Sequence, residues 1–292
     1  MPLHPDFNSL TGHTDEASPM NRRNFIQTAV GVGFAAATLP ISAQTMIHTD
    51  SVGLLAGRVE LSINGQTVPV YRAQPEGKSN LPVILVISEI FGVHEHIADV
   101  ARRYAKLGYL ALAPELLIRQ GDAGSYAGIA ELMKEVVSKV PDAQVMQDLD
   151  AVLVWAGQHG GDLERVGING FCWGGRITWL YAAHNPRIKA GVAWYGRLSG
   201  PVNELSPQHP IDIAASLRSP VLGLYGGKDS GISLDSVRQM ESALTKGHSG
   251  SEFHVYEQAG HAFHADYRPG YSAPEAIDGW QRSLTWLRQH GV

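Results

Sequence analysis

The feature of this sequence that most constrains its fold is one uninterrupted apolar run, Pro82–Ser88. A strand with one face in water alternates apolar and polar residues, whereas an unbroken apolar run is typical of a strand that is buried on both faces. Such strands occur in parallel sheets, where consecutive strands are joined by crossover connections that are usually helices. The run therefore predicts a sheet with helices packed on both faces.

The sequence after this run alternates between strand-like and helical patterns. Short β-rich segments are expected at Tyr109–Ala113, Arg165–Gly170, Lys189–Tyr195, Pro220–Tyr225 and Glu252–Tyr256. Helices are expected at His94–Leu107, Ser125–Val140, Ala143–His159, Gly174–His184, Leu234–Thr245 and Ala276–His290. This alternation indicates a mostly parallel sheet within an α/β domain.

Two further β-rich runs, Arg58–Ile63 and Thr67–Arg72, precede the apolar run and flank Asn64–Gly65. Both residues of that dipeptide tolerate a positive φ, which makes it a strong signal for a hairpin turn. The expected fold class is therefore α/β, with a mostly parallel central sheet, helices on both faces and an N-terminal antiparallel hairpin.

Composition limits the classes of function. The 292 residues include 23 Lys and Arg against 28 Asp and Glu, which gives a net charge of −5. No run of Lys and Arg is present, and binding to nucleic acid needs clustered positive charge, so a nucleic-acid partner is not expected. Cys172 is the only cysteine, which excludes an internal disulfide and a zinc site built from thiolates.

The first 43 residues resemble an export signal. Arg22 and Arg23 are followed by the uncharged, Ala- and Gly-rich stretch Thr28–Ala43. That stretch is too short and too weakly apolar for a stable transmembrane helix, so membrane insertion is not expected. Paired arginines before such a stretch resemble a twin-arginine signal, with cleavage expected after Ala43.

This interpretation divides the chain into a signal region, 1–43, and one domain, 44–292. It predicts a periplasmic or secreted protein whose precursor is a partner of the twin-arginine export machinery. Met1 and Met20 are alternative starts, because the nineteen residues before Met20 make the charged region long. An N-terminal amphipathic helix of a cytosolic protein is the alternative.

Cys172 lies in the sequence GFCWGG, residues 170–175, between an expected strand and an expected helix. This is the pattern of the nucleophile elbow with Cys in place of Ser, a turn so sharp that side chains at 170 and 174 would collide. The following helix would direct its N–H groups and its dipole at the nucleophile. A thiol reacts at neutral pH only with a base or a lowered pKa. The alternative is a buried structural cysteine.

In this architecture the partners of the nucleophile follow it in the order acid, then histidine. Asp229 comes just after the apolar strand at 220–225, and His261 follows the last expected strand. A carboxylate there can hold an imidazole in one tautomer. Each residue has a structural alternative, since Asp229 could stabilise a turn or cap the next helix and His261 could lie on a surface loop. Their order at three strand ends favours a catalytic triad.

Metal and nucleotide sites have weaker support. His94, His96, His261 and His264 have ligand-like spacings, but no third ligand follows at a defined distance, so no metal is predicted. No phosphate loop or dinucleotide fingerprint follows the first buried strand, so no cofactor is predicted.

At these residues the chain resembles the dienelactone hydrolase family, the carboxymethylenebutenolidases of the α/β-hydrolase fold. The resemblance extends from about Gly57 to the C-terminus and includes SEIFG at 88–92, FCWGG at 171–175, GKD at 227–229 and GHAF at 260–263. AWYG at 193–196 and ADYRP at 265–269 are similar to one branch of the family.

The resemblance implies Cys172 as nucleophile, His261 as base and acid, and Asp229 as the carboxylate that orients the histidine. It also implies that Glu89 pairs with the resting thiol and helps to deprotonate it when substrate arrives. The implied oxyanion hole consists of the backbone N–H groups of Ile90 and Trp173.

Substrate recognition departs from the family pattern. Well-known members bind a substrate carboxylate through two arginines, one of them four residues after the catalytic histidine, where this chain has Ala265. Arg119, Arg197 and Arg268 are the candidates to replace it, and Tyr195 is a further candidate for substrate binding.

The expected function is hydrolysis of an ester or lactone through an acyl-cysteine. Thioester hydrolysis on the same triad is the alternative, as are dehalogenation or C–C hydrolysis on the same scaffold. From other classes, an exported binding protein with a vestigial site would not need an intact triad. A thiol redox sensor would use Cys172 but leave Asp229 and His261 unexplained.

Overall fold

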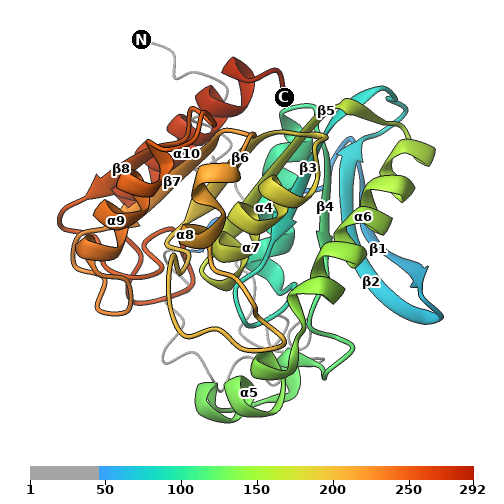
Figure 1. Ribbon diagram of the computed structural model, residues 1–292. Coiled ribbons are helices and arrows are strands. Elements are labelled where there is room, and N and C mark those ends of the chain that lie inside the picture. Colours follow the sequence, from blue (N-terminus) through green and yellow to red (C-terminus); the bar gives the residue numbers. More distant parts are fainter. Residues whose placement is uncertain (1–45) are drawn as a thin grey trace.

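The computed structural model describes residues 46–292 (Figure 1). The predicted signal region, 1–43, lies outside the described residues. Within them, no helix has both the length and the apolar character needed to cross a bilayer.

Eight strands, seven α-helices and three short 3₁₀ turns make up the described chain. The strands are β1 (Leu54–Ile63), β2 (Gln66–Pro75), β3 (Leu81–Ile87), β4 (Leu110–Pro114), β5 (Gly161–Phe171), β6 (Ile188–Trp194), β7 (Val221–Gly226) and β8 (Glu252–Tyr256). The α-helices are α4 (Glu95–Lys106), α5 (Ile129–Glu135), α6 (Asp142–Gln158), α7 (Trp173–His184), α8 (Pro210–Ile213), α9 (Leu234–Leu244) and α10 (Ala273–Gln289). The 3₁₀ turns are η1 (Ala123–Ser125), η2 (Val137–Lys139) and η3 (Ala214–Ser216).

The strands form one sheet in the order β1-β2-β4-β3-β5-β6-β7-β8. Strands β1 and β2 pair antiparallel about the predicted turn at Asn64 and Gly65, and β2 pairs antiparallel with β4. All pairings from β4 to β8 are parallel. Every residue of β3 except Pro82 is buried, as the apolar run predicted. The fold class predicted from the sequence is confirmed.

The direction of the crossovers explains how the helices divide between the two faces. The connection from β3 through α4 leads to β4, toward the β1 edge of the sheet. The connection from β5 through α7 leads to β6, in the opposite direction, toward the β8 edge. Because such crossovers are right-handed, α4 and α7 lie on opposite faces of the sheet. Helix α10 packs beside α4, where the rings of Tyr104 and Trp280 have centroids 4.7 Å apart.

This topology places a crevice where the connections diverge, between the carboxyl ends of β3 and β5. In open α/β sheets, ligands bind at such a switch point. The residues that leave β3 begin with Ser88 and Glu89, and the residue that leaves β5 is Cys172. The fold therefore brings the loops that carry SEIFG and FCWGG to the same edge of the sheet.

One predicted helix differs from the structure. The segment Ser125–Val140 is a short helix, α5, flanked by the 3₁₀ turns η1 and η2. Gly128 has the extended backbone of a helix N-cap, and Val136 leaves the helical region at φ −122° and ψ −68°. Helix α5 lies at the end of the molecule in Figure 1 and buries only Leu132, so little packing holds it together. Local spacing therefore predicted a longer helix than tertiary packing supports.

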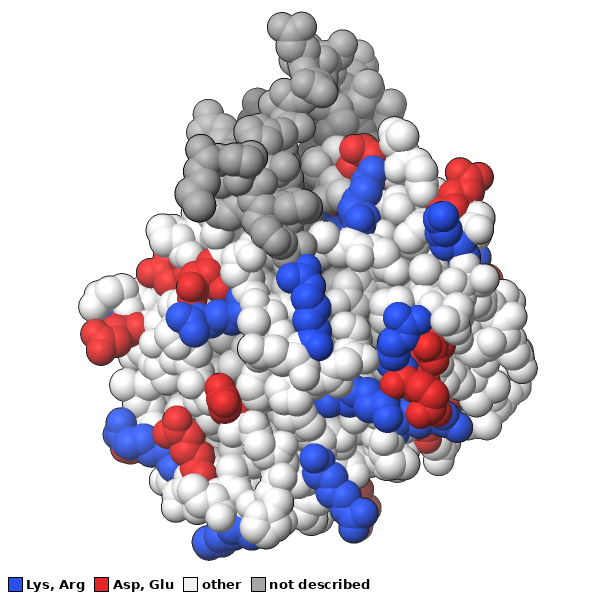
Figure 2. All heavy atoms as spheres, turned by 90° about the horizontal axis from the view of Figure 1, so that it is seen from above, with Lys and Arg blue, Asp and Glu red and all other residues white. Residues whose placement is uncertain are grey.

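Charged side chains are mixed over the face shown in Figure 2, where Lys and Arg alternate with Asp and Glu across a largely uncharged surface. Exposed ion pairs of the described chain include Arg238 with Asp235 and Arg187 with Glu164. This face of the described chain has no continuous basic field.

Candidate active site

Cys172 occupies a strained turn between β5 and α7. Its backbone has φ 54° and ψ −113°, a conformation that L-residues rarely adopt and that clusters at functional sites. A Cβ at Gly170 would lie 2.2 Å from the carbonyl oxygen of Gly174, and one at Gly174 would lie 2.4 Å from that of Ile87. Both glycines are therefore required, as the elbow pattern predicted.

The elbow directs Cys172 toward the N-terminus of a helix. Its backbone N–H donates to the carbonyl of Trp194 at 2.9 Å, which fixes the turn against β6. Trp173 is the first residue of α7, and the first N–H groups of a helix have no acceptor within it. The loop after β3, which contains Ile90, adjoins this helix start because Gly174 touches Ile87. The two N–H groups implied as an oxyanion hole thus come from neighbouring segments.

His261 and Asp229 form a hydrogen-bonded pair. Nδ1 of His261 lies 2.7 Å from Oδ2 of Asp229, whose side chain is almost fully buried. The other oxygen, Oδ1, accepts the backbone N–H groups of Gly231 at 2.8 Å and Ile232 at 3.1 Å. Asp229 therefore both stabilises its turn and holds the imidazole, which combines the two roles that the sequence left open.

The second nitrogen of His261 faces the thiol. Burial alone would lower the pKa of His261, but hydrogen bonds with Asp229 and with Cys172 raise it to about 10. The site thus favours the imidazolium form next to a developing thiolate. Ala262 follows with a positive φ of 60°, so the backbone turns sharply directly after the histidine.

Glu89 is buried at the carboxyl end of β3, with 1% of its surface exposed. An unpaired carboxylate there would be costly, so it requires either a partner or a raised pKa. The structure has a partner: Oε2 of Glu89 lies 3.2 Å from Nε2 of His94. Burial raises the pKa of Glu89, but the hydrogen bond and charge of His94 outweigh it and the pKa is lowered. The hydrogen bond that Glu89 makes in this structure is with His94, not with Cys172.

Two tyrosines, Tyr195 and Tyr267, lie near Glu89 and Cys172. Tyr195 is fully buried with an unusual φ of 39°, and its ring lies 5.1 Å from that of His261. Burial raises the pKa of Tyr195 and of Tyr267 well above the usual value, and the charges of Glu89 and Cys172 raise them further. Both hydroxyls therefore lie near the carboxylate and the thiol, as neutral hydrogen-bond donors.

The three candidate arginines lie in different places. The guanidinium of Arg119 is committed to Asp148 and to the carbonyl of Ile63, away from the site. Arg197 is exposed. Arg268 lies over the ring of Phe91 at 5.6 Å, and its charge lowers the pKa of both site tyrosines. Arg268 is the one of the three that the structure places at the site.

Sequence reasoning missed His94 and Tyr267 as members of the site. His94 was considered only for metal-ligand spacing, and Tyr267 only as part of the ADYRP block. The available signal was that His94 follows SEIFG closely in the sequence. A side chain a few residues after a carboxylate at the end of a strand can fold back and contact that carboxylate. Two surface hollows, one beside Asp150 and His184 and one beside Glu241 and Phe253, contain no member of the site.

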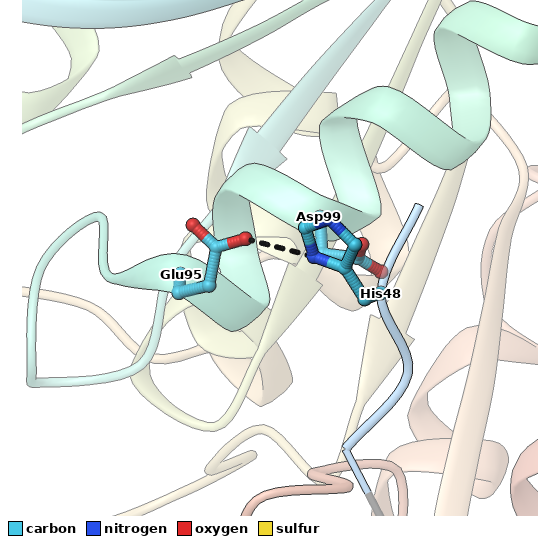
Figure 3. A group of neighbouring side chains, drawn as sticks. All are labelled: His48, Glu95 and Asp99. Atoms are coloured by element: carbon cyan, nitrogen blue, oxygen red, sulfur yellow. Dashed lines mark ion pairs between the residues drawn. The ribbon is translucent and has the colours of Figure 1, made fainter. Parts of the chain in front are cut away.

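Among residues 46–292, one cluster has the composition of a metal site. Ligand atoms of His48, Glu95 and Asp99 lie within 4.8 Å of one another, and Figure 3 shows the ion pair between His48 and Glu95. Arg102 also pairs with both carboxylates, and Arg103 pairs with Asp99. These guanidinium groups already neutralise the acidic side chains, so the cluster is explained as an ion-pair network.

Comparisons with known proteins agree with this geometry. Residues 68–291 match the model of the "Dienelactone hydrolase family". A "Putative carboxymethylenebutenolidase" of Methylorubrum extorquens is 55% identical over 288 residues, which cover 98% of each chain. A "Probable 2-oxo-3-(5-oxofuran-2-ylidene)propanoate lactonase" of a Bradyrhizobium species is 32% identical and covers 80% of this chain and 93% of its own.

A solved structure extends the comparison to the fold. The crystal structure of a "Putative Dienelactone Hydrolase" from Klebsiella pneumoniae is 55% identical and has a TM-score of 0.79. It covers 81% of this chain and 99% of its own. The match of the family model, the similarity along nearly the whole sequence and the shared fold place this chain in the dienelactone hydrolase family.

Proposed function

We propose that the protein hydrolyses a carboxylic ester or lactone through an acyl-cysteine intermediate. Cys172 is the nucleophile, His261 the general base and acid, and Asp229 the group that orients the histidine. The single observation that carries this proposal is the His261–Asp229 hydrogen bond at 2.7 Å, with the elbow thiol on the other side of the imidazole.

The first half of the reaction transfers the acyl group. Nε2 of His261 takes the thiol proton while Sγ of Cys172 forms a bond to the carbonyl carbon. The carbonyl oxygen becomes negative and accepts the N–H groups of Ile90 and Trp173. The C–O bond of the ester then breaks, and His261 gives the proton to the departing alkoxide. In a lactone this alcohol stays attached to the acyl chain.

The second half releases the product. His261 takes a proton from water, whose oxygen attacks the thioester carbonyl at the same oxyanion hole. The C–S bond breaks, and the proton returns to the sulfur of Cys172. Water adds across the original ester bond, and the enzyme returns to its starting state.

Glu89 is proposed as a second base. Its carboxylate is held at the end of β3 near the site, and it raises the pKa of both site tyrosines. On this proposal the thiol stays protonated and protected at rest, and Glu89 is an alternative to His261 as acceptor of its proton when substrate enters. On that route the imidazolium of His261 protonates the departing alkoxide, and Glu89 returns its proton to the sulfur when the C–S bond breaks.

The relatives and the residues of the site support a lactone or ester as the substrate class. The Methylorubrum and Bradyrhizobium relatives are described as a carboxymethylenebutenolidase and a lactonase, both of which act on lactones. Arg268, with the hydroxyls of Tyr195 and Tyr267, would bind an anionic group of such a substrate. We also propose that the domain is residues 44–292 and that it is periplasmic or secreted after removal of the signal region.

The test is a panel of 4-nitrophenyl esters, unsaturated lactones and acyl thioesters with the purified protein and with Cys172→Ala. The expected result is a burst of one 4-nitrophenol per chain, followed by slower turnover, and a loss in Cys172→Ala on the order of 10⁴-fold or more. A small residue strains the elbow little, so the fold should persist. Undiminished hydrolysis by Cys172→Ala would show that the elbow is not the reacting centre. Turnover of thioesters alone would assign the thioesterase alternative.

A further inference from the structure

The pair formed by Glu89 and His94 is a buried contact of the site that the triad does not use. Both side chains are buried, with 2% and 6% of their surfaces exposed. Oε2 of Glu89 is bonded to His94, while Oε1 is buried and has no partner within the described chain. The carboxylate thus has one oxygen held and one available.

Hydrogen bonds fix the backbone of His94, and ring contacts fix its imidazole. Its backbone N–H donates to the carbonyl of Gly92, and its own carbonyl accepts the N–H of Ala98 at the start of α4. The imidazole stacks on His96 with centroids 6.0 Å apart and meets the edge of Tyr267 at 4.8 Å. This is a rotamer locked by packing, which is what a group that orients another side chain requires.

We propose that His94 is a positioning residue that holds Glu89 in place and ionised beside Cys172, so that Oε1 remains free to accept the thiol proton. This inference rests on the proposed role of Glu89 as second base. It assigns His94 a part in the reaction without contact with the substrate.

The charges around the pair support an ionised Glu89. The charges of His94 and His96 both lower the pKa of Glu89, against the effect of burial. The charge of Glu89 acts on Tyr195 and Tyr267, and that of His94 acts on Glu115. Cys172 and Arg268 act on the same two tyrosines. His96 is itself bound to Asp266 at 3.0 Å, which leaves His94 as the only imidazole in hydrogen-bond contact with Glu89 among the described residues.

Removal of the His94 imidazole would change the protonation state of the Glu89 carboxyl group. In His94→Leu, burial is no longer opposed by a hydrogen bond, so the pKa of Glu89 rises and the carboxyl is neutral at moderate pH. A neutral carboxyl cannot take the thiol proton. It also no longer repels a thiolate, so the thiolate–imidazolium form of Cys172 and His261 becomes more populated. Turnover therefore falls while the thiol becomes easier to alkylate.

The experiment compares His94→Leu, His94→Gln, Glu89→Gln and the double variant Glu89→Gln/His94→Leu in the full chain. Gln retains an N–H donor near the position of Nε2, so His94→Gln is the matched control. The readouts are kcat and KM for 4-nitrophenyl acetate and the rate of alkylation by iodoacetamide from pH 6 to 9. Cys172 is the only cysteine, so alkylation has no background from other thiols. Circular dichroism and Tm report folding of each variant.

We expect His94→Leu to lower kcat by at least about tenfold with little change in KM, as for the loss of a general base. Alkylation at pH 6 should be at least about threefold faster, and the difference should shrink toward pH 9 as the neutral Glu89 ionises. His94→Gln keeps the hydrogen bond but not the charge, so its kcat should lie between those of wild type and His94→Leu. Because His94 acts through Glu89, the double variant should equal Glu89→Gln.

The proposal is overturned if His94→Leu lowers kcat equally with and without Glu89→Gln, or if His94→Gln is as impaired as His94→Leu. It is also overturned if alkylation by the leucine variant matches wild type at every pH. The alkylation assay needs no substrate, so it is independent of the hydrolytic function. If Cys172→Ala keeps esterase activity but alkylation follows the expected pattern, the proposed function fails while the His94–Glu89 coupling stands.

Discussion

The guanidinium of Arg103 and the carboxylate of Asp266 form a buried ion pair, with Nη2 and Oδ2 3.0 Å apart. Arg103 lies on α4, and Asp266 lies five residues after His261. The same carboxylate bonds Nδ1 of His96 at 3.0 Å and accepts the N–H of Ile47 at 3.2 Å. The pair therefore fastens the histidine loop to the helix that follows the Glu89 loop.

The first prediction is that Asp266→Asn destabilises the fold. The change removes the carboxylate that His96 and Arg103 share, while Arg103 keeps Asp99 as a partner. The loss of unfolding free energy should therefore be at most about 3–5 kcal/mol, the cost of a buried charge left without a partner. Urea unfolding at pH 7 would measure it. Asp235→Asn is the control, because Asp235 pairs with Arg238 on the surface and should contribute little. Equal midpoints for the two variants would contradict the structural role of the pair.

The pH dependence of this pair has a definite sign. The partners His96 and Arg103 lower the pKa of Asp266 although burial opposes them. A lowered pKa adds stability that is present above the unfolded value, about 3.9, and is lost as the pH falls below it. Wild-type Tm should therefore fall more steeply than that of Asp266→Asn between pH 4 and 2. Parallel curves of Tm against pH for the two proteins would argue against a lowered pKa of Asp266.

The second prediction concerns Asp229→Asn. An amide cannot favour the imidazolium form, so kcat should fall by about 10⁴-fold, as for other triads. The pKa of His261 is raised to about 10 by Asp229 and Cys172, so the stability gained from its protonation is complete below pH 6.5 and is lost between 6.5 and 10. The stability difference between wild type and the variant should therefore shrink over that range. A difference that is constant with pH would be inconsistent with the His261–Asp229 coupling.

The third prediction is that Arg268→Gln affects only anionic substrates. Loss of a charge-assisted hydrogen bond should raise KM for a carboxylate-bearing lactone or ester by about 10- to 100-fold. KM for 4-nitrophenyl acetate should not change. Arg197→Gln, at an exposed position, is the control and should leave both values as in wild type. An equal effect of Arg268→Gln on neutral and anionic esters would show that Arg268 does not bind the anionic group.

The fourth prediction tests the signal region. Arg22→Lys together with Arg23→Lys should leave the precursor in the cytoplasm, because the export machinery reads the arginine pair and Lys does not replace it. Fractionation with N-terminal sequencing would detect the precursor and, in wild type, a mature chain that begins near Gln44. Arg218→Lys, an exposed position in the folded domain, should be exported normally. Efficient export of the double-Lys variant would rule out this type of signal.

The fold and the triad candidates could be predicted because their signals are local. The apolar run at β3, the Asn64–Gly65 turn and the glycines at 170 and 174 each constrain the backbone within a few residues. Parallel strands present their carboxyl ends at one edge, so residues that directly follow strands meet there whatever the details of packing. Cys172, Asp229 and His261 were found in this way.

The partners of the other site residues could not be predicted, because the sequence offered several side chains of the same type for each contact. Three arginines were candidates from the sequence, and only packing decided that Arg119 pairs with Asp148 while Arg268 lies over Phe91. The helix expected at Ser125–Val140 is interrupted for a similar reason, since too few buried contacts hold that segment in one helix.

The sequence by itself determined the order of strands and helices, the elbow that presents Cys172, and the strand ends that bear Asp229 and His261, because backbone geometry and hydrophobic periodicity act over short distances. The tertiary structure alone decided that His94 holds Glu89 and that Asp266 fastens the histidine loop to α4. Those pairings depend on which buried charges meet once the core has closed. A buried charge must find a partner, but the sequence does not state which one.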